Sequence, residues 1–93
     1  MLGTYKAGRE IDMATGAVLL SELREVVDGS DEAIVIVDCS GITFMDSAGF
    51  HALVDATEYA ARRGHTLVVR NLSPSCARLV RLCDFEHELQ VMP

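Results

Sequence analysis

Hydrophobic and polar positions along the chain change between strand-like and helix-like periods. Residues 33–37 form a continuous apolar run of mostly β-branched side chains, which is typical of a strand covered on both faces. Residues 65–70 have the same character, and residues 4–11 read as a short strand of mixed polarity. Residues 89–92 can add a last short strand. The pattern therefore predicts strands distributed over the whole chain.

Residues 16–27 form the first predicted helix. Apolar side chains recur there at the i, i+1, i+4, i+7 and i+8 positions, which puts them on one helix face. Thr15 is the expected N-cap. Because an apolar face must pack against another element, we expect this helix to cover a sheet. The predicted buried stripe consists of Leu19, Leu20, Leu23, Val26 and Val27.

Two further helices follow. The second begins near Ser47 and ends at Arg62-Arg63-Gly64, where cations in the last turn and a glycine mark a helix end. Its predicted stripe consists of Phe50, Leu53, Val54, Thr57 and Ala61. The third helix has Ser73 as N-cap and Pro74 at its first position. It runs to about residue 83, with a stripe of Cys76, Leu79, Val80 and Cys83.

Strands and helices alternate along the chain, and residues 38–46 form a loop before the second helix. Short connections between alternating strands and helices indicate βαβ units with right-handed crossovers. No internal repeat or low-complexity linker interrupts this order. The sequence therefore predicts one α/β domain over residues 1–93, with helices mainly on one face of a parallel or mixed sheet.

Composition narrows the classes of function. Ninety-three residues support one core but leave little room for a deep catalytic cleft. A net charge of −6 argues against nucleic-acid binding, because such binding depends on Lys and Arg neutralising phosphates. We interpret the arginines at 62–63, 78 and 81 as parts of solvated helix faces. No apolar run approaches the ~20 residues that span a bilayer, and the N-terminus lacks a secretory pattern. We therefore expect a cytoplasmic protein with protein partners, rather than nucleic-acid or membrane contacts.

The cysteines and histidines form no disulfide or metal-binding pattern. The three cysteines include no Cys-x-x-Cys pair, and the three histidines lack metal-ligand spacing, so we expect no metal site. Cys76 and Cys83 would lie about 10 Å apart along the third helix, too far for a disulfide. Cys39 ends a strand, and a neighbouring element can bring another thiol close to it. A redox input through Cys39, Cys76 and Cys83 is therefore one hypothesis.

Ser47 is presented at a helix start, directly after a predicted loop. The simplest interpretation is that Asp46-Ser47 caps the helix, as such residues usually do. A hydrolase nucleophile would need a base and an oxyanion site. His51 is the only local base, and no Gly-x-Ser-x-Gly elbow surrounds the serine. The sequence therefore disfavours an enzyme, and we expect no catalytic residue.

Three motifs support a more specific interpretation. The stretch Asp38-Cys-Ser-Gly-Ile-Thr-Phe-Met-Asp-Ser-Ala-Gly49 resembles the D-S-x-x-F-M-D-S-x-G signature of STAS domains of the anti-sigma factor antagonist (anti-anti-sigma factor) type. Gly8-Arg-Glu-Ile-Asp-Met-Ala-Thr15 is similar to the family's G-E-L-D-x-A-T. Leu72-Ser-Pro74, followed by Arg78-Leu79, is similar to its S-P-x-V-x-R-L-L. The resemblance covers nearly the whole chain and implies a STAS-like α/β fold with a mixed sheet.

The resemblance also implies a switch at Ser47. In this family, the unphosphorylated protein binds an anti-sigma factor that is also a serine kinase, and so releases a sigma factor for transcription during a stress response. Phosphorylation of the serine ends that binding, and a separate phosphatase restores it. No cofactor is implied. The expected contact surface comprises Asp12, Thr43, Phe44, Met45, Asp46, Ser47, Ala48, Gly49, His51, Asp55 and Glu58.

One departure from the family leaves an alternative open. Family members usually carry a further strand before the equivalent of Tyr5, and this chain begins too late for it. The strand at residues 4–11 would then be an exposed edge, and unpaired edges invite pairing, so we expect a homodimer through it. A STAS module that works as an adaptor or scaffold in a stress-signalling complex, without a phosphorylation switch, is the alternative function.

Overall fold

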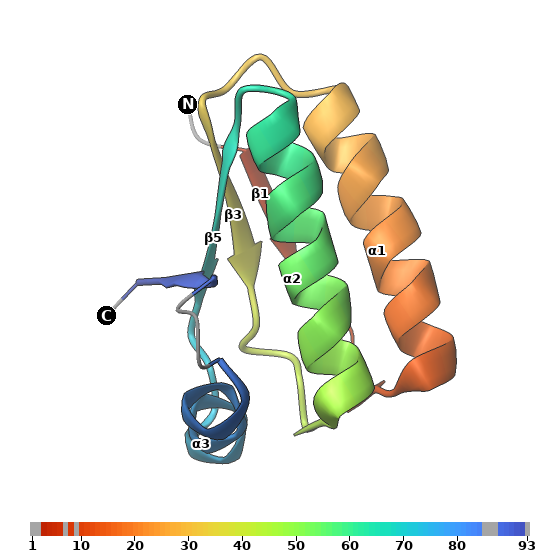
Figure 1. The fold of residues 1–93 in the computed structure, drawn as a ribbon, viewed down its shortest axis with the longest axis vertical. Helices are drawn as coiled ribbons and strands as arrows, with labels where there is room; N and C mark the ends of the chain where they lie inside the picture. Colours follow the sequence, from red (N-terminus) through yellow and green to blue (C-terminus); the bar gives the residue numbers. More distant parts are fainter. Residues whose placement is uncertain (1–2, 7, 9, 85–87, 93) are drawn as a thin grey trace.

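The computed structural model describes residues 3–6, 8, 10–84 and 88–92. Its elements, in chain order, are β1 (Gly3–Lys6), β2 (Glu10–Ile11), α1 (Met13–Asp28), β3 (Ile34–Asp38), β4 (Phe44–Met45), α2 (Ser47–Arg62), β5 (Thr66–Arg70), α3 (Pro74–Cys83) and β6 (Gln90–Val91). The predicted alternation of strands and helices is confirmed, and the fold is α/β (Figure 1).

The main sheet has the strand order β1-β3-β5-β6, and each of these pairings is parallel. β3 lies between β1 and β5, and its residues Val35, Ile36 and Val37 are buried. The centre of the apolar run of residues 33–37 is thus a covered strand, whose bounds are displaced by one residue from the predicted ones. β1 lies at the edge of the described sheet, and pairing with a second copy there stays a prediction.

Residues 4–11 do not form the single strand that their pattern suggested. β1 pairs with β3, whereas β2 pairs with β4 in a separate two-stranded parallel sheet. β4 lies within residues 38–46, which the pattern assigned to a loop. A two-residue strand has too few positions for a period-2 pattern to show. The small sheet therefore gave no recognisable signal.

Helices α1 and α2 cover one face of the main sheet and run side by side in the same direction (Figure 1). Their apolar faces meet the side chains of β3 and β5 in one core. This bears out the expectation of helices mainly on one face. The most completely buried members of the core include Leu23, Val27, Val35, Val37, Leu53, Leu67 and Val69.

Two details of the first two helices differ from the sequence prediction. The N-cap of α1 is Asp12 rather than Thr15, because Asp12 is extended and its side chain accepts the Thr15 N–H, so the helix begins at Met13. In α2, Ala61 is exposed, and the buried positions after Val54 are Ala56 and Ala60. Small side chains in i, i+4 register let α2 lie close to the sheet.

The third helix begins as its sequence predicts. Ser73 is the N-cap, its hydroxyl accepts the Cys76 N–H over 3.2 Å, and Pro74 is the first helical residue. This is the position where proline's missing N–H costs nothing. Within the residues that the structure describes, no helix combines the length and apolar character needed to cross a membrane.

Candidate functional site

The small β2–β4 sheet brings two aspartates together at the start of two helices. Ile11 of β2 pairs with Met45 of β4, and the Asp46 N–H donates to the Ile11 carbonyl over 3.2 Å. Asp12 and Asp46 come next along the two strands, and each is the N-cap of the helix that follows. Helices α1 and α2 therefore begin next to each other at one end of the molecule (Figure 1).

Asp12 is held by a capping box. Its carboxylate accepts the Thr15 N–H at 3.0 Å, while Thr15 Oγ1 accepts the Asp12 N–H at 2.9 Å and donates to the Glu10 carbonyl at 2.7 Å. These bonds, first of all the one from the Thr15 backbone, hold the pKa of Asp12 below its usual value. Asp12 therefore carries a full negative charge at neutral pH.

Asp46 and Gly49 define the start of α2. Asp46 Oδ1 accepts the Gly49 N–H at 3.0 Å. A Cβ atom on Gly49 would lie 2.5 Å from the Ile11 carbonyl oxygen, 2.6 Å from Ile11 Cγ2 and 2.8 Å from Met45 Cγ. No real side chain tolerates such contacts. The signature glycine is therefore the residue that lets α2 approach the β2–β4 sheet.

Ser47 is the first residue of α2, and its side chain is exposed. The first N–H groups of a helix lack intrahelical partners and carry the positive end of the helix dipole. An anion attached at this position is favoured by ~0.3–1 kcal/mol. The Ser47 hydroxyl can therefore accept a phosphoryl group without opposing the helix that carries it.

The other predicted contact residues fall into two groups. Met45 is only 7% exposed and Gly49 is buried, so these two shape the site from inside rather than offer a contact surface. Phe44, by contrast, is 52% exposed beside the Asp46 cap. The exposed or half-buried members of the predicted surface are Asp12, Thr43, Phe44, Asp46, Ser47, Ala48, His51, Asp55 and Glu58.

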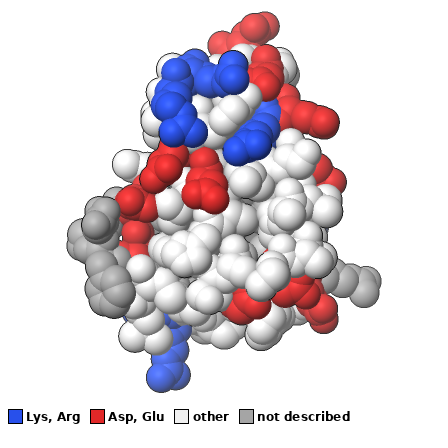
Figure 2. All heavy atoms as spheres, turned by 45° about the vertical axis from the view of Figure 1, so that its right-hand side comes forward, with Lys and Arg blue, Asp and Glu red and all other residues white. Residues whose placement is uncertain are grey.

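A shallow hollow of about 320 Å³ lies next to Ser47, between the N-terminal halves of α1 and α2. Its lining includes Met13, Ala17 and Leu20 from α1, together with Ala48, His51 and Ala52 from α2. Met13 is 80% exposed. The side of the molecule that carries these helices has few charges across its middle (Figure 2). The site therefore combines an exposed hydroxyl with an adjoining hollow whose lining, apart from His51 and Asp55, is apolar.

The contribution of α1 to this hollow was not predicted from the sequence. Met13, Ala17 and Leu20 become neighbours of the Ser47 loop only when the two helices lie side by side. The one available signal was Met13, a flexible apolar side chain directly after Asp12, of a kind that often serves protein interfaces.

The cysteines lie where the core needs small side chains. Cys39 and Cys76 are 0% and 2% exposed, and Cys83 packs against the core from its rim. Burial, with smaller contributions from Cys76 and the Asp38 carboxylate, raises the pKa of Cys39 to about 12. A reactive thiol needs a lowered pKa and access to solvent. The position of Cys39 therefore disfavours the redox hypothesis.

Residues 2–93 match the family model of the STAS domain. Solved structures that are similar to this chain include the following three. The anti-sigma factor antagonist SpoIIAA in its unphosphorylated form has a TM-score of 0.74 at 12% identity, over 97% of this chain and 78% of that one. A sulfate transporter family protein from Wolinella succinogenes has a TM-score of 0.75 at 20% identity, over 97% and 75%. The SulP transporter STAS domain from Vibrio cholerae has a TM-score of 0.75 at 16% identity, over 99% and 73%.

Proposed function

The chain belongs to the STAS domain family, and we propose that it acts there as an anti-sigma factor antagonist whose partner binding is switched off by phosphorylation of Ser47. The observation that carries this proposal is the position of Ser47. Its side chain is exposed at the first residue of α2, next to the Asp46 cap and to the apolar hollow between the two helices.

Phosphorylation would change the surface more than the fold. A phosphoserine adds about −1.5 to −2 charges, and the helix N-terminus accommodates them. The same charge roughly doubles the negative charge that Asp12 and Asp46 already carry there. A partner fitted to the neutral serine and the apolar hollow would face an anion that it must desolvate.

That cost is large enough to act as a switch. A desolvated, uncompensated charge at an interface costs ~2–5 kcal/mol. At ~1.4 kcal/mol for each tenfold in affinity, a penalty of about 3–4 kcal/mol lowers the affinity by a few hundredfold. The partner would then dissociate without any refolding of the domain.

The proposed cycle assigns no catalytic step to this chain. Unmodified protein binds an anti-sigma factor with serine kinase activity and so releases a sigma factor in the bacterial cytoplasm. The kinase phosphorylates Ser47 and is released, and a phosphatase resets the cycle. Asp46 orients the hydroxyl or meets a basic group of the kinase, while Phe44, Met13 and the exposed face of α2 supply contact area.

A second candidate function is a STAS adaptor without a phosphorylation switch. It is favoured by the two transporter-associated STAS structures, whose TM-scores equal that of the anti-sigma factor antagonist within 0.01. In that case the same apolar hollow would hold a permanent partner. Modification of Ser47 separates the two candidates.

The test uses the partner that co-purifies with the tagged protein from its host. That partner is isolated, and its affinity is measured for the unmodified protein, for Ser47→Ala and for protein with phosphoserine incorporated at position 47. We expect the first two to bind alike and phosphoserine at 47 to weaken binding at least a hundredfold. Phosphoserine at position 75, an exposed residue in the first turn of α3, is the matched control and should change little.

Equal affinity for unmodified and Ser47-phosphorylated protein would reject the switch and favour the adaptor. Loss of binding with phosphoserine at 75 as well would show that a phosphate anywhere on the domain suffices. The location of Ser47 at the start of α2 would then no longer support the proposed switch.

A further inference from the structure

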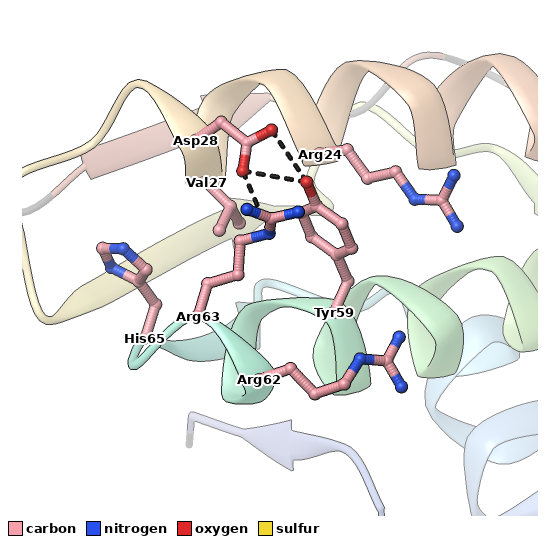
Figure 3. Close-up of a pocket in the computed structure, with 7 residues that line it drawn as sticks. All are labelled: Arg24, Val27, Asp28, Tyr59, Arg62, Arg63 and His65. Carbon is pink, nitrogen blue, oxygen red and sulfur yellow. Dashed lines mark hydrogen bonds and ion pairs between the residues drawn. The ribbon is translucent and has the colours of Figure 1, made fainter.

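A second hollow lies at the opposite end of α1 and α2 from Ser47. It measures about 760 Å³, and we call it the arginine hollow because Arg24, Arg62 and Arg63 line it together with Asp28 and Tyr59. Arginine side chains gather at this end of the helix side, with acidic side chains beside them, in a protein whose net charge is −6 (Figure 2). Figure 3 shows the hollow from close by.

Tyr59 is fixed at the centre of the arginine hollow. Its hydroxyl donates to the Asp28 carboxylate, with oxygens at 2.7 and 2.9 Å, and Arg63 Nε lies 3.3 Å from the same carboxylate. The Arg63 guanidinium carbon is 4.5 Å from the centre of the Tyr59 ring. The hydrogen bond to Asp28 raises the pKa of Tyr59 above its usual value, so the phenol stays protonated. These contacts hold the site in shape.

Arg24 and Arg62 have no carboxylate partner within the part of the chain that the structure describes. The Arg24 guanidinium carbon lies 5.2 Å from the centre of the Tyr59 ring. In Figure 3 Arg24 extends from α1 and Arg62 from α2, and both point in the same direction, past Tyr59. Arg62 lies in the last turn of α2, where a cation is favoured by the helix dipole. Arg24 lies before the last turn of α1, so the helix dipole does not explain its position.

The charges of the side chains that line the arginine hollow indicate the chemical class of its ligand. Three guanidiniums and the single Asp28 carboxylate leave two uncompensated positive charges in the lining. A phosphate monoester carries about −1.5 to −2 charges at neutral pH and offers oxygens that guanidinium groups bind in pairs. A hollow of about 760 Å³ leaves room for the organic part of such a molecule beside its phosphate. We propose that the arginine hollow binds a small phosphate-bearing molecule, with its phosphate held between Arg24 and Arg62.

This site is independent of the Ser47 switch. Ser47 is the first residue of α2 and Arg62 the last, so about 22 Å of helix separates them at 1.5 Å per residue. A ligand in the arginine hollow would therefore leave the Ser47 surface open to a protein partner. The protein could bind both at once.

The test titrates isotope-labelled protein with inorganic phosphate, with glycerol 3-phosphate and with hexaglutamate while amide and arginine side-chain NMR signals are followed. We expect saturable shifts centred on Tyr59 with at least one of the phosphates. The Arg24→Gln/Arg62→Gln double variant should weaken that binding at least tenfold. Arg78→Gln/Arg81→Gln on α3 is the matched control and should leave it unchanged, and thermal melts check that both variants fold.

Tighter binding of glycerol 3-phosphate identifies an organic phosphate, and equal binding identifies the phosphate ion alone; either result supports the site. Three results would overturn it. These are the lack of saturable binding for both phosphates, equal weakening by the α3 control, and tighter binding of hexaglutamate, which would make the hollow a docking site for an acidic peptide. None of them bears on Ser47, whose test uses a separate partner and variants.

Discussion

Gly49→Ala is the substitution whose effect the structure defines most closely. The new methyl group would meet the Ile11 carbonyl oxygen at 2.5 Å, Ile11 Cγ2 at 2.6 Å and Met45 Cγ at 2.8 Å. The carbonyl oxygen cannot easily retreat, because it accepts the Asp46 N–H that joins β2 to the start of α2. The substitution must therefore displace the start of α2 from the small sheet.

The change in the free energy of unfolding is the balance of an overpacking cost and a gain in helix propensity. Overpacking a tight core usually costs ~1–3 kcal/mol and occasionally more. Alanine gains ~1 kcal/mol over glycine inside a helix. Since three contacts lie below van der Waals distance, we place the overpacking cost at the upper end of its range, which leaves a net loss of about 2 kcal/mol. For a domain of this size that corresponds to a melting temperature lower by roughly 10 °C.

Gly16→Ala is the matched control, because Gly16 also lies in a helix at the interface of α1 and α2. Its Cβ would meet the Ala48 carbonyl oxygen at 3.5 Å and the Ala52 Cβ at 3.6 Å, which are ordinary contacts. Helix propensity should then dominate and stabilise this variant by up to ~1 kcal/mol. Urea unfolding and thermal melts measure both variants. A Gly49→Ala protein as stable as wild type, or a Gly16→Ala protein less stable than Gly49→Ala, would refute the reasoning.

Three further predictions use other parts of the structure. Asp46→Ala should lose ~1 kcal/mol of stability in urea unfolding because it removes the α2 N-cap, and Asp46→Asn should retain most of it; equal losses would count against the capping role. Hydrogen bonds lower the folded-state pKa of Asp12 and Asp38 below 3.8, so their contribution should be complete above that pH and disappear as the pH falls through the folded values. The double Asn variant should therefore show a shallower acid loss of stability than wild type, and an unchanged slope would contradict this. Cys39 and Cys76 should resist a thiol reagent in the native protein and react once it is unfolded, whereas fast native labelling of either would revive a redox role.

The parts of the fold with strong local signals could be predicted from the sequence. The apolar runs of β3 and β5, and the Ser73-Pro74 start of α3, depend on the residues of one segment alone. The β2–β4 sheet could not be predicted in this way, since each strand has two residues and their pairing joins distant segments. Without that sheet, the local pattern did not single out Asp12 rather than Thr15 as the cap of α1.

In the candidate site, too, features that depend on contacts between distant segments could not be predicted from the sequence. The family motif at residues 38–49 predicted an exposed serine at Ser47. The second family motif, at residues 8–15, predicted that Asp12 lies near that serine. The part of the hollow formed by Met13 and Leu20 depends on how α1 lies against α2, which no local pattern records. The arginine hollow is a clearer case. Arg62 and Arg63 read as a solvated helix end until Arg24 is brought next to them by the fold.

The central claim is that Ser47 is a phosphorylation switch. Its most direct test is the intact mass of the protein purified from its own host, during growth and under stress, for wild type and for Ser47→Ala. We expect a wild-type population heavier by one phosphate, whose share changes with the condition and which the alanine variant lacks. A single unmodified mass in every condition, or the same heavier population in Ser47→Ala, would contradict it.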